Sequence, residues 1–357
     1  MGFLMCFLCC LRVTLFFSIQ PSASLNFLTV RRIGLLTEAP QVSGLSLLGP
    51  PPFLLLSLVF NEEPEWLSFW LNVTHAAMNE MPYAVIISTS PRKLALAQQA
   101  AAKSSAAGFV GFTPPFDKKV KTNLNADLLR AHTENIAAAL QNRHLSNFSY
   151  AMLLSSNCLF IRPVGHLGFK AAVLKPPVVL IDPQAKLRPD IPFPTEWFWP
   201  AVEKDTCLLS WVRHKYAVQD DAGKEGIAAS QMEGLTASRR LWVRLVRLYW
   251  DYVRVCGNFT KPREYPEEEI WYATIVGMLT HGVGASSTGM GIEDALHVCR
   301  IHWEDEGYQP SLVELTQIQA DSSGVLVSKR FPRDKSHNVT QKGACWAAEK
   351  VPLVRPC

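Results

Sequence analysis

Two short, uninterrupted apolar segments constrain the fold of this chain more than any other feature of its sequence. Phe53 to Phe60 reads FLLLSLVF and Tyr83 to Ser88 reads YAVIIS, and polar or turn-forming residues bound both segments. Strands that are apolar on both faces belong to parallel sheets that helices cover on each side. The first segment is too short to span a membrane. We therefore predict two strands inside a parallel sheet.

Helical and extended patterns alternate from these strands up to about residue 160. Helices are predicted at Glu65 to Ala77, Pro91 to Ala106 and Leu124 to Gln141, and further strands at Phe109 to Phe112 and Tyr150 to Leu154. This alternation predicts an α/β fold with a mostly parallel central sheet flanked by helices.

The second half of the chain is less regular. An extended connection rich in proline contains a candidate strand at Val178 to Ile181, and Gln219 to Gly226 reads as a charged loop. Ser238 to Val255 is amphipathic, with Ser238 as a suitable N-cap. Glu267 to Thr280 predicts a second helix, with acidic residues at the end where the helix dipole favours them.

The N-terminal residues differ in composition from the rest of the chain. Met1 to Ile19 is apolar apart from a few positions such as Arg12, and a Gly-Pro-Pro-Pro run occupies residues 49–52. We expect an uncleaved type II signal anchor, with a cleaved signal peptide as the alternative. The expected organisation is an anchor or signal peptide at 1–20, a stem or linker at 21–52, a folded domain at 53–340 and a C-terminal tail at 341–357.

Two further patterns suit a chain in the secretory pathway. Four Asn-X-Ser/Thr sequons begin at Asn72, Asn147, Asn258 and Asn338. Six cysteines follow the N-terminal segment and could form up to three disulfides, with buried thiols as the alternative; they are Cys158, Cys207, Cys256, Cys299, Cys345 and Cys357. The net charge of +4 and the lack of a long basic run argue against a nucleic-acid-binding protein.

The first candidate for function is the end of the strand at Tyr150 to Leu154. Ligands of open α/β sheets bind beyond the carboxyl ends of the strands, so Ser155, Ser156 and Asn157 are placed to meet a substrate. An ordinary polar turn is the alternative.

Two charged groups are the other candidates. Three acids open the helix that starts at Glu267, and their repulsion, together with the proximity of Trp271, could raise the pKa of one carboxyl toward that of a general base. A strand is predicted at Val325 to Phe331, and its adjacent cations Lys329 and Arg330 could bind phosphate oxygens. Helix capping by the acids and a solvated pair of cations are the alternatives.

The order of these motifs resembles the core-2/I-branching β-1,6-N-acetylglucosaminyltransferases and their xylosyltransferase relatives. The family's YFINLSGQDYP is similar to YAMLLSSNCLF at 150–160, and its SQWFALSRE to SQMEGLTASRR at 230–240. Its DEHFWATL is similar to EEIWYATI at 268–275, and its FARKF to VSKRF at 327–331. The resemblance extends over roughly residues 53–335.

The resemblance implies a GT-A nucleotide-sugar fold, a UDP-sugar donor, inversion at the sugar carbon and no obligatory metal or other cofactor. It places the catalytic base on Glu269 and the preceding acid on Glu268. It places the diphosphate-binding cations on Lys329 and Arg330, which would do the work of a metal ion in other enzymes of this fold. The expected acceptor is a glycan or glycoprotein, and the expected location is a Golgi or other secretory-pathway membrane, with the domain in the lumen.

The chain departs from the family at two positions of the presumed donor or acceptor site. Cys158 stands where the family has the Asp of SGQD, and Met232 or Glu233 replaces the Trp of SQWF. We include Glu233 among the expected substrate-binding residues, together with Ser155 to Asn157. These departures keep open a catalytically inactive lumenal binding protein on the same fold.

Two further alternatives come from other classes of site. A serine hydrolase could use Ser286 or Ser287 with His281, although the chain lacks a GxSxG motif there. The acidic run Glu304 to Glu306 is expected to be a surface feature, with a metal site as the alternative.

Overall fold

The computed structural model describes residues 53–78, 81–113, 127–164, 204–216, 230–257, 265–280, 289–291, 294–300, 326–329 and 331–347, and the single positions 311, 313, 316 and 317. The expected strand at Val178 to Ile181, the loop at Gln219 to Gly226 and the apolar segment Met1 to Ile19 lie outside these residues. Within the described part, no helix is both long and apolar enough to cross a bilayer.

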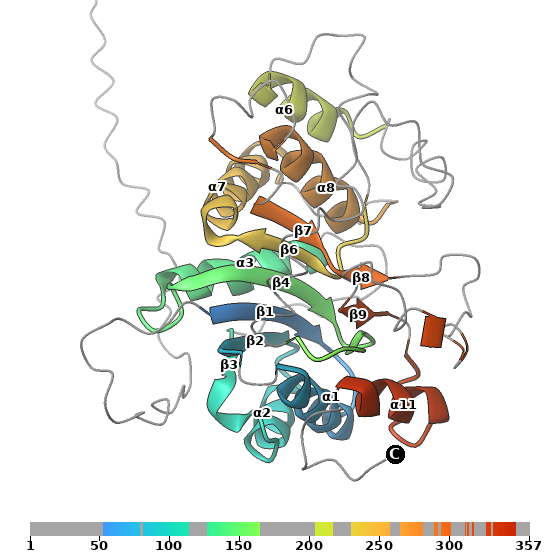
Figure 1. Ribbon diagram of the computed structural model, residues 1–357. Helices are drawn as coiled ribbons and strands as arrows, with labels where there is room; N and C mark the ends of the chain where they lie inside the picture. Colours follow the sequence, from blue (N-terminus) through green and yellow to red (C-terminus); the bar gives the residue numbers. More distant parts are fainter. Residues whose placement is uncertain are drawn as a thin grey trace, which may run out of the picture. The chain divides into compact units, whose positions relative to one another are not determined.

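A six-stranded sheet forms the centre of the domain (Figure 1). Four strands are parallel, in the order β3-β2-β1-β4, and β6 and β7 continue the sheet next to β4 through antiparallel pairings. Their bounds are β1 Phe53–Phe60, β2 Tyr83–Thr89, β3 Val110–Phe112, β4 Phe148–Ser155, β6 Leu235–Ser238 and β7 Ala295–His297. The predicted α/β fold with a mostly parallel central sheet is confirmed.

A second, smaller sheet lies after the end of β4. Its order is β5-β9-β8, with bounds Leu159–Phe160, Val327–Ser328 and Cys299–Arg300. Leu159 pairs with Ser328, and Cys299 pairs with Val327. The smaller sheet therefore brings the turn that follows β4 next to a segment almost 170 positions later in the chain.

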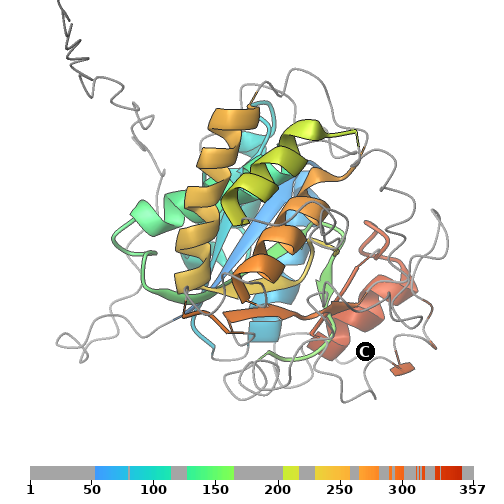
Figure 2. The ribbon, with the colours of Figure 1, turned by 90° about the horizontal axis from the view of Figure 1, so that it is seen from above.

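Helices cover both faces of the large sheet (Figures 1 and 2). Leu54, Leu56 and Leu58 of β1 belong to a core that includes side chains of α1, α2 and α11, while Phe53 and Leu55 belong to a core with α3, α6, α7 and α8. The helix bounds are α1 Pro64–Met78, α2 Leu94–Ala102, α3 Asp127–Gln141, α6 Thr206–Tyr216, α7 Arg239–Cys256, α8 Glu267–Thr280 and α11 Asn338–Ala347.

Several predicted bounds agree with the structure, and one helix is shorter than expected. β1 and α8 have the predicted ends, and Ser238 caps α7 by accepting a 3.2 Å hydrogen bond from the Leu241 amide. The predicted helix from Pro91 to Ala106 ends at Ala102 instead, and a 3₁₀ turn follows at Ala107–Phe109. Beyond the end of the helix, the Ser105 amide donates to the Asn72 side chain instead of a helical carbonyl. Helix α11 continues beyond residue 340, where the domain was expected to end.

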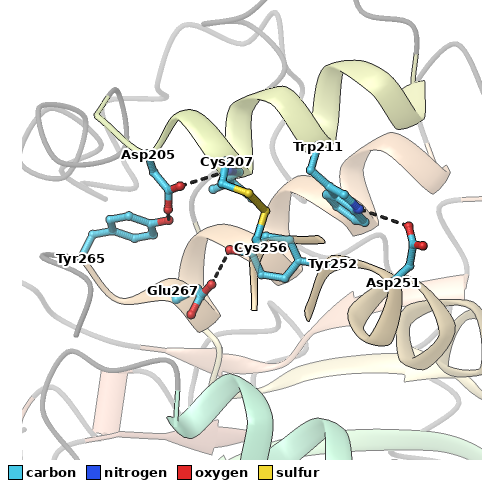
Figure 3. The surroundings of a disulfide bond; sticks show 9 residues. Asp205, Cys207, Trp211, Asp251, Tyr252, Cys256, Tyr265 and Glu267 are labelled. Atoms are coloured by element: carbon cyan, nitrogen blue, oxygen red, sulfur yellow. Dashed lines mark hydrogen bonds between the residues drawn. A yellow bond between two sulfur atoms is a disulfide. The ribbon is translucent and has the colours of Figure 1, made fainter. Parts of the chain in front are cut away.

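One disulfide joins α6 to the end of α7. Cys207 and Cys256 are bonded, with their Cα atoms 5.7 Å apart (Figure 3). Cys345 is also disulfide-bonded, whereas Cys158 and Cys299 are buried thiols, so the described cysteines include both of the forms expected from the sequence.

Hydrogen bonds around this disulfide reach the start of α8. Tyr252 of α7 donates to Glu267 Oε1 over 2.5 Å, and Tyr265 donates to Asp205 Oδ2 over 2.6 Å. Figure 3 shows these contacts near the Cys207–Cys256 bond. The disulfide therefore belongs to the structure that holds the N-terminal turn of α8.

We predict that replacing Cys207 and Cys256 together by alanine lowers the free energy of unfolding by about 2–4 kcal/mol. The cross-link closes a long loop, with a sequence separation of 49, and its loss increases the entropy of the unfolded chain. Urea denaturation of the full chain measures the effect. Val255→Ala, at a neighbouring and 59% exposed position, should stay within about 0.5 kcal/mol of the wild type. Equal stability of the double variant and the wild type would contradict a stabilising role.

Candidate functional site

The strand order of the large sheet marks a place for a ligand. The chain passes from β1 to β2 on one side of β1 and returns on the other side as β4. Crevices at such a reversal, beyond the carboxyl ends of the strands, bind ligands in open α/β sheets. Val59 of β1 pairs with Ser88 of β2 and with Ser155 of β4, so hydroxyl side chains lie on both sides of β1 near this edge.

The turn after β4 contains the three residues expected from the sequence. Ser155 donates a 2.6 Å hydrogen bond to Asn157 Oδ1. Ser156 is buried, and its carbonyl accepts from the Trp66 indole over 2.7 Å. Cys158 follows, and its carbonyl accepts from the Trp70 indole over the same distance. Two tryptophans of α1 therefore fix the backbone of this turn. The contact of Ser156 with Trp66 is a structural one, made through its backbone carbonyl.

The last predicted motif lies next to this turn. The Phe331 amide donates to the Asn157 carbonyl over 3.1 Å, and β9 pairs with β5 directly after Cys158. Lys329 lies between these two contacts in the chain. Arg330, the other expected cation, lies outside the described residues.

Lys329 forms an ion pair with Glu233. Its Nζ atom lies 2.6 Å from Glu233 Oε1, and the side chains are 18% and 6% exposed. The other carboxylate oxygen of Glu233 accepts a 2.9 Å hydrogen bond from Gln231 Nε2. Glu233 reaches the site from the segment before β6, where Gly234 has a φ of 82° and lies so close to Cys299 that a side chain at this position would clash.

The ion pair keeps both of its members charged. Burial would raise the pKa of Glu233, but the charge and hydrogen bond of Lys329 outweigh it and lower this pKa. Burial would likewise lower the pKa of Lys329, but the charges of Glu233 and Glu269 raise it. The influence of Glu269 on Lys329 and the hydrogen bond from the Ser230 amide to the Glu269 carbonyl are consistent with a cluster of charges that includes the first turn of α8.

The three acids that open α8 are all buried. Glu267, Glu268 and Glu269 are 0%, 5% and 7% exposed. Glu267 binds Tyr252 on the side of the disulfide, and the Glu269 carbonyl accepts from the Ser230 amide over 3.0 Å. Burying several carboxyl groups together costs free energy unless each is paired or neutral. Acids that only cap a helix are usually exposed to solvent. The burial of these three acids therefore argues against the alternative that they serve only as helix caps.

Glu268 has the most perturbed chemistry among these acids. Burial, followed by the charge of Glu269, raises its pKa well above the usual value, and Glu233 adds to the effect. Its Oε2 atom has no hydrogen-bond partner among the described residues. Glu268 therefore keeps its proton to a higher pH than an exposed carboxyl group does, and one of its oxygens has no protein partner among the described residues.

Sequence reasoning missed three residues beside Glu233. Gln231 orients the Glu233 carboxylate, and the Gln231 carbonyl accepts from His297 Nε2 over 3.2 Å. Burial lowers the pKa of His297. The charge of Glu233 also acts on the pKa of His132 of α3, a helix that packs against α8. Single histidines in a helix and in an unrecognised strand gave no signal in the sequence.

The other candidates from the sequence cannot be placed. His281, Ser286, Ser287 and the acidic run Glu304 to Glu306 lie outside the described residues. In the part of the chain that is described, no three His, Cys, Asp or Glu side chains are grouped as they would be to hold a metal ion.

We predict that Lys329→Met destabilises the protein by about 3 kcal/mol at pH 7. The substitution leaves the Glu233 carboxylate buried without its cation, and this is the costly way to break a buried pair. The double variant Lys329→Met/Glu233→Gln should recover more than half of the loss. Denaturant unfolding of the wild type, both single variants and the double variant gives the free energies of a double-mutant cycle. Additive changes in the free energy of unfolding would show that Lys329 and Glu233 do not stabilise each other.

We predict that Glu268→Gln stabilises the protein at pH 7–8 and that the gain disappears near pH 4. The pKa of Glu268 is raised on folding, so the protonated carboxyl contributes stability at low pH. That contribution is lost as the pH rises from the unfolded value of 4.5 toward the folded one. Thermal unfolding at several pH values measures the gain, and Glu65→Gln at an exposed position of α1 is the control. A gain that is the same at every pH would contradict the raised pKa of Glu268.

Comparisons with known proteins find similarity in structure but not in sequence. No protein-family model matches the chain, and no curated protein matches it in sequence. The structure is similar to the crystal structure of an active-site mutant of LgtC. The TM-score is 0.38 and the identity 10%, over 84% of this chain and 98% of the LgtC chain. At this identity, no residue role is carried over from LgtC to this chain.

Proposed function

We propose that this protein is an inverting, metal-independent glycosyltransferase that moves a sugar from a UDP-sugar to a hydroxyl of a glycan or glycoprotein. N-acetylglucosamine is the first sugar to test, because the sequence resembles the core-2/I-branching transferases. The observation that carries the proposal is the convergence of Glu233, Glu268, Glu269 and Lys329 into one buried charged cluster. These residues come from three distant motifs of the resemblance, and the cluster lies next to a fourth, the turn at Ser155 to Asn157.

The proposed reaction assigns a role to each charged group. Glu269 takes the proton from the acceptor hydroxyl, whose oxygen forms a bond to the anomeric carbon. The bond between that carbon and the diphosphate breaks on the opposite face, and the electron pair leaves with UDP. Lys329 stabilises the negative charge that develops on the diphosphate. Glu268, as a neutral acid, can donate a hydrogen bond to a substrate oxygen.

The ion pair between Lys329 and Glu233 determines how the cation would be used. A diphosphate has to share Lys329 with Glu233 or displace this carboxylate, which Gln231 also holds. In the shared arrangement, Glu233 keeps Lys329 charged and in place before the donor binds. We propose this positioning role for Glu233, in addition to the binding role expected from the sequence.

We also propose that the domain works in the lumen of the Golgi or another secretory compartment, attached by a type II anchor. The Cys207–Cys256 disulfide favours an oxidising compartment. Asn72, Asn147 and Asn338, the described sequon asparagines, are exposed, as acceptors of N-glycans must be. The anchor itself is proposed from the sequence alone.

We predict that the full chain releases UDP from at least one UDP-sugar in the presence of EDTA and a glycan acceptor. Glu269→Gln should lower this rate about 10²- to 10⁴-fold, because it removes the general base. Glu267→Gln is the matched control, since Glu267 binds Tyr252, and it should keep most of the activity. Release that stops in EDTA would overturn the metal-independent mechanism, and an active Glu269→Gln variant would overturn the role of Glu269.

One observation favours a second function, a nucleotide-binding protein without catalysis. Cys158 occupies the position of the family's acidic residue, and its thiol is 1% exposed and lies 3.2 Å from Ser155 Oγ. A buried thiol cannot replace a carboxylate in reading a substrate. Calorimetry separates the two functions, because binding of UDP without turnover of any UDP-sugar would support the inactive protein.

A further inference from the structure

A chain of buried hydrogen bonds runs from the end of β3 to His132 of α3. Thr113 Oγ1 donates to Asn135 Oδ1 over 2.8 Å, and Asn135 Nδ2 donates to Ser57 Oγ over 3.0 Å. Ser57 Oγ lies 2.9 Å from His132 Nδ1. All four side chains are less than 5% exposed. A polar network this deep in an α/β core needs a reason, because isolated polar groups there are costly.

The partners of Asn135 determine the direction of this chain. Asn135 Nδ2 also faces the carbonyls of Leu58 and Ile86, which can only accept, so the nitrogen of the amide must point toward Ser57. Ser57 Oγ accepts from Asn135, and its proton is left to donate to His132 Nδ1. His132 is then the tautomer with its proton on Nε2. Burial lowers the pKa of His132 to about 4, so the ring is neutral at physiological pH.

The proton on His132 Nε2 has no acceptor in the described part of the protein. The ring is 0% exposed, and Nε2 lacks a hydrogen-bond partner there. Buried donors are almost always satisfied in folded proteins, so a fixed donor without an acceptor points to a group that binds later. The network would hold this donor in place in advance.

The position of His132 connects it to the candidate site. The next residue of α3, Thr133, makes a 2.8 Å hydrogen bond with the hydroxyl of Tyr272, which lies one turn after Glu268 in α8. The charge of Glu233 acts on the pKa of both His132 and Glu268. His132 Nε2 and Glu268 Oε2, two buried polar atoms without partners among the described residues, therefore belong to two helices that pack together and are joined by this hydrogen bond.

We propose that the Nε2–H group of His132 is a preformed donor to a hydroxyl group of the sugar that binds at the candidate site. This proposal rests on the proposed function, because it names a part of the same substrate. A hydroxyl accepts from an N–H group and can donate to a carboxylate, so it suits a neutral donor near acidic groups. A phosphate oxygen can only accept, and the proposed reaction assigns the diphosphate to Lys329.

The experiment combines histidine NMR with calorimetry on the full chain. ¹⁵N-histidine labelling gives the tautomer of His132, whose signal is assigned by its loss in His132→Gln. Calorimetry then measures UDP and UDP-N-acetylglucosamine binding to the wild type, His132→Gln and His132→Phe. Glutamine keeps an N–H donor near the Nε2 position, whereas phenylalanine keeps only the ring. His144→Phe, at an exposed position, is the matched control, and melting curves show that each variant is folded.

We expect the Nε2–H tautomer in the wild type and about tenfold weaker binding of UDP-N-acetylglucosamine by His132→Phe, with UDP binding unchanged. His132→Gln should bind nearly as well as the wild type. Ser57→Ala removes the hydrogen bond to His132 Nδ1 and should therefore produce a mixture of the two neutral tautomers of His132. An unchanged tautomer in this variant would show that core packing, and not the hydrogen-bonded chain, sets the tautomer.

Different outcomes overturn different statements. A proton on Nδ1, or equal binding of UDP-N-acetylglucosamine by the wild type and His132→Phe, would overturn the role of His132 and leave the proposed function intact. Equal weakening of UDP and UDP-N-acetylglucosamine binding by His132→Phe would overturn a contact with the sugar. A wild type that binds neither molecule would overturn the proposed function, and the sugar hydroxyl as the ligand of His132 with it.

Discussion

The two-sided burial of β1 is the constraint on which the rest of the structure depends. All eight residues of this strand are buried, with β2 and β4 on its two edges and helices over both faces. A strand in this environment has to be apolar on both faces. Ser57 is the exception, and its hydroxyl is satisfied by His132 and Asn135 rather than by water. The one polar residue of the central strand thus connects β1 to His132 and Asn135 of α3.

The buried charged cluster lowers the stability of the fold. Glu233 and Lys329 form a buried pair, and Glu268 is buried with a raised pKa beside Glu269. Apolar residues of similar size would give a more stable core at these positions. Several elements hold the cluster together. The tryptophans of α1 fix the turn after β4, and the Cys207–Cys256 region holds the start of α8. Structure that supports an otherwise unfavourable arrangement is typical of a functional site.

The sequence predicted those elements whose pattern is set within a single segment. The ends of β1 and α8 and the cap at Ser238 could be read from apolar runs, acids and a capping residue. The short strands β5 to β8 could not, because they depend mainly on the partners with which they pair, whereas β9 lies within the strand predicted at Val325 to Phe331. For the same reason, the pairing of β5 with β9, which brings Lys329 to the site, could not be predicted from either segment alone.

The site followed the same division. Glu233, Glu268, Glu269 and Lys329 were expected from the family resemblance, and their mutual electrostatic contacts are consistent with one site. Gln231, His132 and His297 were missed, because each acts through a contact between elements that are distant in the sequence. A neutral histidine whose tautomer is set by three other side chains has no signature in a single sequence.

Hydrogen–deuterium exchange with and without UDP-N-acetylglucosamine tests the central claim most directly, because it reports where a ligand acts along the chain. The claim is that the edge beyond β1 and β4, together with the first turn of α8 and the segment after β9, is a sugar-nucleotide site. We predict slower exchange of amides at 153–158, 230–235, 267–271 and 327–331, with helix α2 unchanged as an internal reference. Protection elsewhere in the protein, or no protection at a concentration of ligand that saturates binding, would contradict this location for the site.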